Sequence, residues 1–144
     1  MQFESYEAYA AATRTPVQVA PEPQNSDYES GSAVIGEEVW HIRTARTTPT
    51  KPGAFVAFWR RDDNGETAPF PSTDASAGLL VFVAQGNNRG VFRFTRDHLA
   101  QLGITSAPTR AGKRGFRVYP SWCTDLNPQA TRSQRTQAPA FETY

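Results

Sequence analysis

The chain has 144 residues, a formal net charge of +1 and a single cysteine, Cys123. This length is typical of one domain, and one cysteine cannot form an internal disulfide, which is usual for proteins of a reducing compartment. The longest apolar run, Leu79–Ala84, is far shorter than the roughly 20 residues of a membrane-spanning helix. The N-terminus also lacks the layout of a secretion signal. We therefore expect one cytoplasmic domain over residues 1–144, without membrane contact.

Acidic and basic residues are separated along the chain. Residues 1–38 carry seven acidic side chains and one basic side chain, whereas residues 86–144 carry nine basic and three acidic ones. Charge that is separated along a chain can also be separated on the surface, where a basic face attracts polyanions. The alternative is that the two halves neutralise each other across one fold. The pattern predicts an anion-binding surface or an internal charge balance.

The first part of the chain predicts a helix and a hairpin. Phe3, Tyr6 and Tyr9 recur at helical spacing and predict a helix over residues 3–13. Three prolines predict an extended connector over residues 15–26. Next comes a predicted hairpin, whose strands flank Gly36-Glu37 and span residues 32–35 and 39–43.

The middle of the chain alternates loops with strands. Residues 47–53, TTPTKPG, predict a loop because proline and glycine interrupt regular structure. Residues 54–60 predict an aromatic strand, and a polar loop follows over residues 61–72. A second hairpin is predicted with strands over residues 79–84 and 91–94.

The last part of the chain predicts two helices around one strand. A short helix begins at Thr95 or Arg96, runs through Leu102 and ends at Gly103. Residues 115–119 predict the last strand. Asn127-Pro128 has the pattern of a helix cap followed by a first-turn proline, and predicts a helix to about Ala138. The whole order predicts an α+β fold, with a central twisted mixed or antiparallel sheet of about six strands flanked by helices.

Two segments have the composition of a phosphate-binding surface. The TTPTKPG loop presents Thr48, Thr50 and Lys51 on a segment that two prolines restrain, and hydroxyl, amide and ammonium groups are donors to phosphate. The alternative is a tight turn with an exposed lysine. In GKRGFRVYPSW, residues 112–122, basic and aromatic side chains alternate, which is typical of surfaces that grip phosphates and stack bases. The aromatic residues there could equally belong to the core.

Familiar catalytic and metal-binding motifs are absent from the sequence. His41 and His98 are the only histidines, and a zinc site would need both of them to meet Cys123. We therefore assign the histidines to packing or to the surface, and expect no metal site and no cofactor.

The quoted motifs resemble the MepB family, which is bacterial and includes members encoded beside multidrug-efflux genes. The resemblance rests on TTPTKPGAFVAFWRR, GVFRF, LGI, GKRGFRVYPSW and TQAPAF, which occur in this order over nearly the whole chain. It implies a fold similar to PD-(D/E)XK nucleases, the restriction-endonuclease-like fold, and a nucleic-acid-binding role. The positions that it singles out are these: Lys51, Lys113, Arg114, Arg117, Tyr119 and Trp122.

Two residues depart from the family pattern. Arg46 stands where the family commonly has lysine, and Gly78 stands where an aspartate often precedes the strand. Nucleases of this superfamily need acids to hold a divalent metal and a lysine two residues after one of them. Pro49 and Ala111 occupy the positions two residues before the two lysines. The standard catalytic site is therefore absent.

The leading hypothesis is a nucleic-acid-binding protein with a degenerate nuclease-like site, with DNA preferred to RNA as the partner and a homodimer possible. The predicted contact residues are Arg43, Arg46, Thr50, Lys51, Lys113, Arg114, Arg117, Tyr119, Trp122, Arg132 and Arg135. One alternative is an active nuclease that uses Mg²⁺ or Mn²⁺, with Glu29 or Asp74 as metal ligand beside Lys51 or Lys113. Glu38 could also bind such a cation. Another alternative is a protein-interaction or regulatory module.

Overall fold

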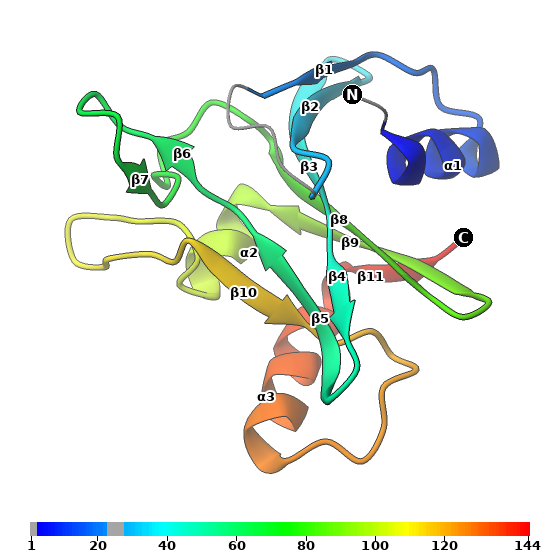
Figure 1. Cartoon of the computed structure of the whole chain (residues 1–144). Helices are drawn as coiled ribbons and strands as arrows, with labels where there is room; N and C mark the ends of the chain where they lie inside the picture. The colour runs from blue at the N-terminus through cyan, green and yellow to red at the C-terminus, as the bar shows by residue number, and fades with distance from the viewer. Residues whose placement is uncertain (1–2, 23–27) are drawn as a thin grey trace.

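The structure is a computed structural model that describes residues 3–22 and 28–144. Figure 1 shows its elements in their spatial arrangement. In chain order they are α1 (Glu4–Thr13), β1 (Val19–Pro21), β2 (Gly31–Ile35), β3 (Glu38–Thr44), β4 (Arg46–Thr48), β5 (Lys51–Ala57), β6 (Arg60–Arg61), β7 (Thr67–Ala68), β8 (Gly78–Gln85), β9 (Asn88–Thr95), α2 (Arg96–Gln101), β10 (Gly115–Val118), α3 (Pro128–Gln137), the 3-10 helix η1 (Ala138–Ala140) and β11 (Phe141–Thr143). None of these helices is long and apolar enough to cross a membrane.

A six-stranded mixed sheet forms the centre of the molecule, in the order β1-β2-β3-β8-β9-β11. Its neighbours pair antiparallel except for β3 and β8, which run parallel with Trp40 opposite Gly78. A three-stranded sheet, in the order β10-β5-β4, lies in front of it in the view of Figure 1. The α+β class and the six-stranded mixed sheet agree with the sequence prediction.

The central sheet buries apolar side chains on both of its faces. Alternation along each strand sends neighbouring residues to opposite faces, so one sheet contributes to two cores. On one face, Tyr6 and Tyr9 of α1 pack against Trp40 and Phe82. On the other face, Phe58, which follows β5, and Val118 of β10 pack against residues of β8 and β9, with α2 and η1 completing the core.

The free edge of β10 is closed by a glutamine side chain. Gln137, 5% exposed at the end of α3, donates from Nε2 to the Arg117 carbonyl at 2.9 Å, and its Oε1 accepts from the Tyr119 amide at 2.9 Å. The side-chain amide thus takes the place of a peptide group in a neighbouring strand. This contact connects the TQAPAF segment to the GKRGFRVYPSW segment, which lie far apart in the sequence.

The structure confirms the three predicted helices, with bounds that differ by one or two residues. It also confirms the five predicted strands that correspond to β2, β3, β8, β9 and β10. The predicted aromatic strand over 54–60 is shifted, because β5 starts at Lys51 and ends at Ala57. In the predicted connector, residues 19–21 form β1, whereas residues 23–26 lie outside the described residues. The predicted polar loop over 61–72 includes the small strand β7, which pairs with β6.

The prediction of a loop at TTPTKPG is wrong. β4 ends at Thr48 and β5 begins at Lys51, so only Pro49 and Thr50 form the turn of a hairpin. Proline has no backbone N–H to donate, so a strand tolerates it where no neighbouring strand needs a hydrogen bond from that position. Pro52 meets this condition, because pairing of β5 with β10 stops at Ala54 and leaves Pro52 beside β4 alone.

Gly78 has a structural reason to be glycine. Its φ is 151°, and a Cβ built on it would lie 2.0 Å from the carbonyl oxygen of Phe94 in β9. An aspartate at this position would therefore force β8 and β9 apart. The nearest preceding carboxylate is that of Asp74, four residues earlier.

We predict that Gly78→Ala lowers the free energy of unfolding by about 3 kcal/mol, from backbone strain together with overpacking. Urea unfolding followed by circular dichroism measures the loss. The matched control is Gly86→Ala, because Gly86 also has a positive φ, 61°, but no atom of the described residues lies within 4 Å of a Cβ there. The control should lose about 1 kcal/mol. Equal losses in the two variants would contradict the assigned contact.

Candidate functional site

A cluster of charged side chains lies between the two sheets. Glu22 accepts from His41 Nδ1 at 2.5 Å and from Arg43 Nη2 at 2.7 Å, and His41 Nε2 donates to Asp74 Oδ2 at 2.9 Å. Ser76 also donates to Asp74 Oδ2, at 2.6 Å. His41 and Arg43 alternate with Trp40 and Ile42 on β3, so they point to the face that the smaller sheet covers. We call Glu22, His41, Arg43 and Asp74 the charged cluster.

This arrangement favours the doubly protonated form of His41. Both ring nitrogens face carboxylate oxygens, and a carboxylate can only accept, so both nitrogens must carry a proton. Burial alone lowers the pKa of His41, but the hydrogen bonds and charges of Asp74 and Glu22 outweigh it and raise the pKa. The hydrogen bond from His41 lowers the pKa of Asp74 to about 2. Burial raises the pKa of Glu22, yet His41 and Arg43 together lower it.

Aromatic rings enclose the two cations of the charged cluster. The His41 ring lies 4.4 Å from the Phe70 ring and 5.6 Å from the Phe58 ring, measured between centroids. The Arg43 guanidinium carbon lies 5.2 Å from the centre of Phe58, a cation–π contact. With two cations and two anions the cluster is neutral, and Arg43 is 1% exposed. The cluster therefore ties the segment after β1 and the loop before β8 to β3, against the Phe58 ring, and does not present a charge to a ligand.

Arg43, predicted as a surface contact, is thus a core residue. Glu29, predicted as a metal ligand, accepts from the backbone amide and hydroxyl of Ser5 at the start of α1, at 3.3 and 3.4 Å. The other predicted ligand, Asp74, is bound in the charged cluster. In the described part of the chain, neither carboxylate is paired with a lysine. Within residues 3–22 and 28–144, no three histidine, cysteine, aspartate or glutamate side chains are placed to hold a metal ion.

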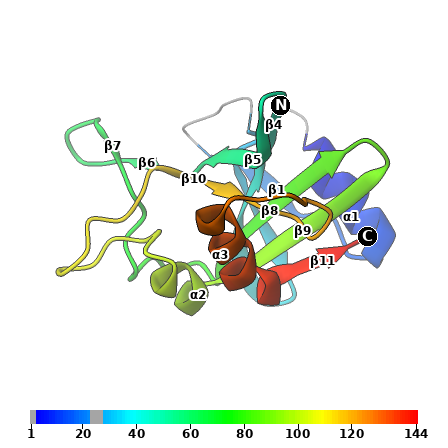
Figure 2. The ribbon, with the colours of Figure 1, turned by 90° about the horizontal axis from the view of Figure 1, so that it is seen from below.

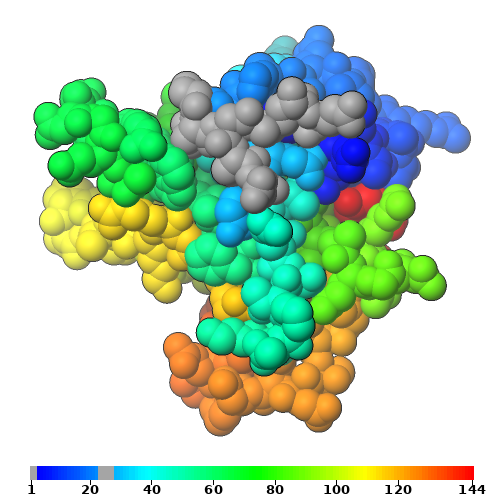
Figure 3. All heavy atoms as spheres, viewed as in Figure 1, coloured from blue at the N-terminus to red at the C-terminus, as the bar shows by residue number. Residues whose placement is uncertain are grey.

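The outer face of the smaller sheet gathers several of the predicted contact residues. Arg46 and Arg117 both stand opposite Phe55 in the strand register, so the three side chains share the face that points away from the core. Lys51 is exposed at the hairpin end of β5. None of the three strands contains an acidic residue. We call Arg46, Lys51, Phe55, Arg117 and Tyr119 the basic sheet face; Figure 3 shows the β4–β5 hairpin in the middle of this side of the molecule, above α3.

Glycines allow two aromatic rings to lie close against the strands of this sheet. A Cβ on Gly115 would lie 2.5 Å from the Phe55 ring, and a Cβ on Gly53 would lie 2.8 Å from the Tyr119 ring. The rings therefore lie over the glycines and beside Arg117. The Tyr28 ring packs edge-on against Phe55, with centroids 6.4 Å apart. The result is a half-exposed aromatic surface with cations around it.

Arg117 connects the sheet to the hairpin. Its Nη2 donates to Thr48 Oγ1 at 2.8 Å and to the Pro52 carbonyl at 3.1 Å, across β5. The guanidinium therefore holds the TPTK turn, in which Thr50 is exposed. Arg114 has a comparable role, because Nε and Nη2 donate to the Thr67 carbonyl at 3.3 and 3.1 Å and connect β10 to β7.

The remaining predicted contact residues lie outside the basic sheet face, and two of them border it. Lys113 is exposed and lines a cavity of about 320 Å³ between the start of β10 and α3. Trp122 is turned toward the protein, where Nε1 donates to Gln85 Oε1 at 2.7 Å and the ring packs on Phe141. Arg132 and Arg135 are exposed on α3. The structure therefore brings together Arg46, Thr50, Lys51, Arg117 and Tyr119. Lys113 and Arg135 each line a cavity that Tyr119 also lines, whereas Trp122 and Arg132 line neither.

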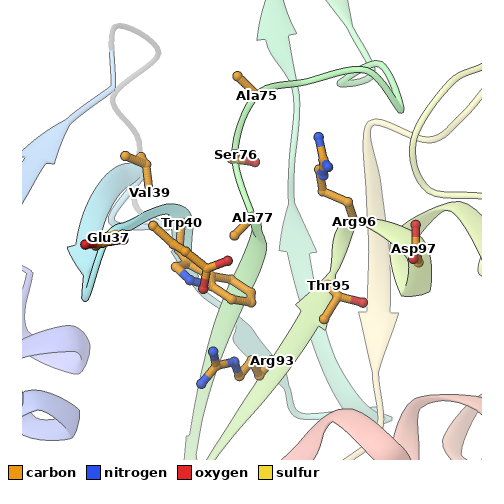
Figure 4. Close-up of a pocket in the computed structure, with 11 residues that line it drawn as sticks. Glu37, Val39, Trp40, Ala75, Ser76, Ala77, Arg93, Thr95, Arg96 and Asp97 are labelled. Atoms are coloured by element: carbon orange, nitrogen blue, oxygen red, sulfur yellow. The ribbon is translucent and has the colours of Figure 1, made fainter.

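A second hollow, of about 590 Å³, lies between the start of β3 and the end of β9. Figure 4 shows Trp40 and Arg93 on one side of it and Thr95, Arg96 and Asp97 on the other. The Arg93 guanidinium carbon lies 4.7 Å from the centre of the Trp40 ring. This hollow has acidic as well as basic lining residues, including Glu37 and Glu38, so it is not an anion site.

Sequence reasoning missed the charged cluster and the role of Phe55. Glu22 lies in the proline-rich connector, where no pattern distinguishes it from a surface glutamate. His41 and Arg43 had the alternation of an ordinary solvent-facing strand. The sequence does hold a signal for the exposed position of Phe55. Phe55 stands between the small or apolar residues Ala54 and Val56, and Gly53 lies two residues before it. This pattern is typical of a ring on the exposed face of a sheet.

These features define an α+β domain whose smaller sheet exposes a basic and aromatic face. The pattern of the MepB-like family matches residues 22–143, so the chain belongs to the MepB-like family, as its motifs predicted. A solved structure described as "Crystal Structure of MepB" is similar to this chain, with 31% sequence identity and a TM-score of 0.86 over 99% of this chain and 97% of that one. No curated protein matches the chain significantly.

We predict that His41 gives the stability of the protein a pH dependence. A raised pKa in the folded state stabilises the fold fully below the ordinary value of 6.5, and this contribution is lost as the pH rises through the raised value. The free energy of unfolding should therefore fall with rising pH above about 6.5, by about 1.4 kcal/mol for each pH unit that separates the ordinary pKa from the raised one. Urea titrations from pH 5 to about 9 measure it.

His41→Gln should remove this alkaline fall, whereas His98→Gln, which changes the other histidine, should keep it. In acid the free energy of unfolding should fall as the pH falls, because Asp74 and Glu22 have lowered pKa values. Their contribution is present above the ordinary value and, for Asp74, is lost between pH 3.8 and about 2. A His41→Gln variant with the alkaline profile of the wild type would show that His41 is neutral in the fold.

Proposed function

We propose that the protein binds nucleic acid through the basic sheet face. The observation that carries this proposal is the combination, on one face of β10-β5-β4, of aromatic rings lying over glycines with Arg46, Lys51 and Arg117 around them. Cations contact phosphates and half-exposed rings stack on bases, whatever the base sequence. No acidic side chain of these strands repels a polyanion. Binding without much sequence preference follows from this chemistry.

The nuclease-like alternative is weaker on the same grounds. Glu29 caps α1, and Asp74 is engaged by His41 and Ser76, so neither is free to hold a metal beside a lysine. As part of the proposal, the domain is a restriction-endonuclease-like scaffold that binds nucleic acid without cutting it, in the cytoplasm, with DNA as the preferred partner. Arg46 supports this, because a guanidinium holds phosphate well and positions an attacking water poorly.

The proposal predicts a binding loss that depends on position. Arg46→Gln with Lys51→Gln should weaken binding to a single-stranded oligonucleotide and reduce the slope of log affinity against log salt by about 1.4, because two phosphate contacts are removed. Fluorescence anisotropy at several salt concentrations measures both quantities. The control, Arg14→Gln with Arg89→Gln, removes the same charge from α1's C-terminal end and from the β8–β9 hairpin.

The control variant should retain most of the affinity and the wild-type slope. Equal losses in the two double variants would mean that only net charge matters, and that the basic sheet face is not the site. An affinity of the wild type that does not depend on salt would contradict phosphate binding altogether.

Cleavage is tested on the same oligonucleotides. We predict that neither Mg²⁺ nor Mn²⁺ stimulates cutting of DNA or RNA, single- or double-stranded. The candidate ligands Glu29 and Asp74 are engaged in other hydrogen bonds, and the described residues hold no group of three metal-ligating side chains. Gel electrophoresis after incubation measures the outcome. The nuclease alternative would be favoured if the wild type cut the oligonucleotides and a folded single variant did not. The variants to test are Asp74→Ala, Glu29→Ala, Lys51→Ala and Lys113→Ala.

A further inference from the structure

A cavity of about 480 Å³ lies beside α3, between the segment that follows β10 and the start of β11. Figure 2, seen from below, shows α3 and β11 next to each other on this side of the molecule. Tyr119 lines the cavity and also belongs to the basic sheet face, so the two surfaces meet at this residue. The other walls come from Ser121, Thr131, Arg135 and Phe141.

The lining has the chemistry of a nucleotide site. Tyr119 and Phe141 supply aromatic surface for a base, whereas Arg135, Thr131 and Ser121 supply a guanidinium and hydroxyls for a phosphate. None of the lining residues is acidic. The volume lies in the range of small-ligand sites, roughly 300–1,000 Å³, and fits one nucleotide rather than a length of strand.

The walls of this cavity are held in place by hydrogen bonds. Gln134 Nε2 donates to the carbonyls of Pro120 and Cys123, at 2.9 and 3.1 Å, and so ties the segment after β10 to α3. Gln137 fixes the backbone of Tyr119 from the same helix. Because the site is formed before a ligand arrives, little ordering entropy opposes binding.

We infer that this cavity binds one nucleoside monophosphate unit, with the base between Tyr119 and Phe141 and the phosphate on Arg135. The inference rests on the proposed function, since it extends the basic sheet face by a single-nucleotide site. A free mononucleotide and one nucleotide of a bound strand share this chemistry. Competition between the monophosphate and an oligonucleotide distinguishes these two ligands. Arg135 and Arg132 lie on the same helix, but only Arg135 lines the cavity.

The test uses adenosine 5′-monophosphate, adenosine and inorganic phosphate as probes, with binding measured by calorimetry and located by amide chemical shifts in NMR spectra. We expect the monophosphate to bind better than either part and to shift the amides of Ser121 and Thr131. Arg135→Ala should weaken monophosphate binding about tenfold, the size of one charge-assisted hydrogen bond, and leave adenosine binding unchanged. Arg132→Ala, the matched control, should change neither.

Equal effects of Arg132→Ala and Arg135→Ala, or no monophosphate binding by a folded wild type, would overturn the inference. A labelled oligonucleotide distinguishes the two proposals. If it binds while the monophosphate does not, the cavity inference fails and the basic sheet face stands. If only the monophosphate binds, in an Arg135-dependent way, the sheet-face proposal fails and the cavity is a site for free nucleotides. Displacement of the oligonucleotide by the monophosphate assigns the cavity to a nucleotide of the strand.

Discussion

The charged cluster is the interaction that fixes the part of the central sheet against which Phe58, the residue after β5, packs. Glu22, His41, Arg43 and Asp74 come from three separate segments of the chain, and their hydrogen bonds fix those segments relative to one another. A buried ion pair contributes little net stability compared with apolar side chains of similar volume. Removing one partner is costly, however, because the other charge stays buried. The cluster therefore selects one arrangement of these three segments more than it stabilises the fold.

The two sheets have separate roles. The central sheet is covered on both faces, by α1 on one side and by β10-β5-β4 on the other, so it offers little surface for recognition. The smaller sheet is buried on its inner face only, through residues such as Val56 and Val118. Its outer face is left to cations and aromatic rings. The proposed contacts with nucleic acid therefore lie on the sheet that contributes less to the core.

Sequence reasoning predicted the helices and the two main hairpins because their signals are local. Apolar spacing, an asparagine cap at Asn127 and the glycine at Gly103 each act within a few residues. It failed where the deciding contact is remote. His41 and Arg43 have the pattern of a solvated strand face, and later residues such as Phe58 and Phe70 bury them. The TTPTKPG segment forms a hairpin because β4 pairs with β5 and the guanidinium of Arg117 bonds to both strands.

The candidate site was predictable in part for the same reason. Alternation on one strand placed Arg117 and Tyr119 on a common face, and the TPTK motif indicated Lys51. Arg46 lies beside these residues because β4 pairs with β5. The prediction of a loop over residues 47–53 excluded this pairing. Trp122 could not be assigned from its neighbours, since its contact, Gln85, lies 37 residues away.

The Gln137 side chain also affects hydrogen exchange at the edge of the smaller sheet. An amide at the edge of a sheet normally exchanges its hydrogen with water easily, because no strand protects it. The amide of Tyr119 instead donates to a side chain that only a folded α3 can hold in place. We therefore expect its exchange to depend on the opening of α3. Helix α3 and the edge of β10 are thus linked by side-chain hydrogen bonds, although they share no backbone ladder.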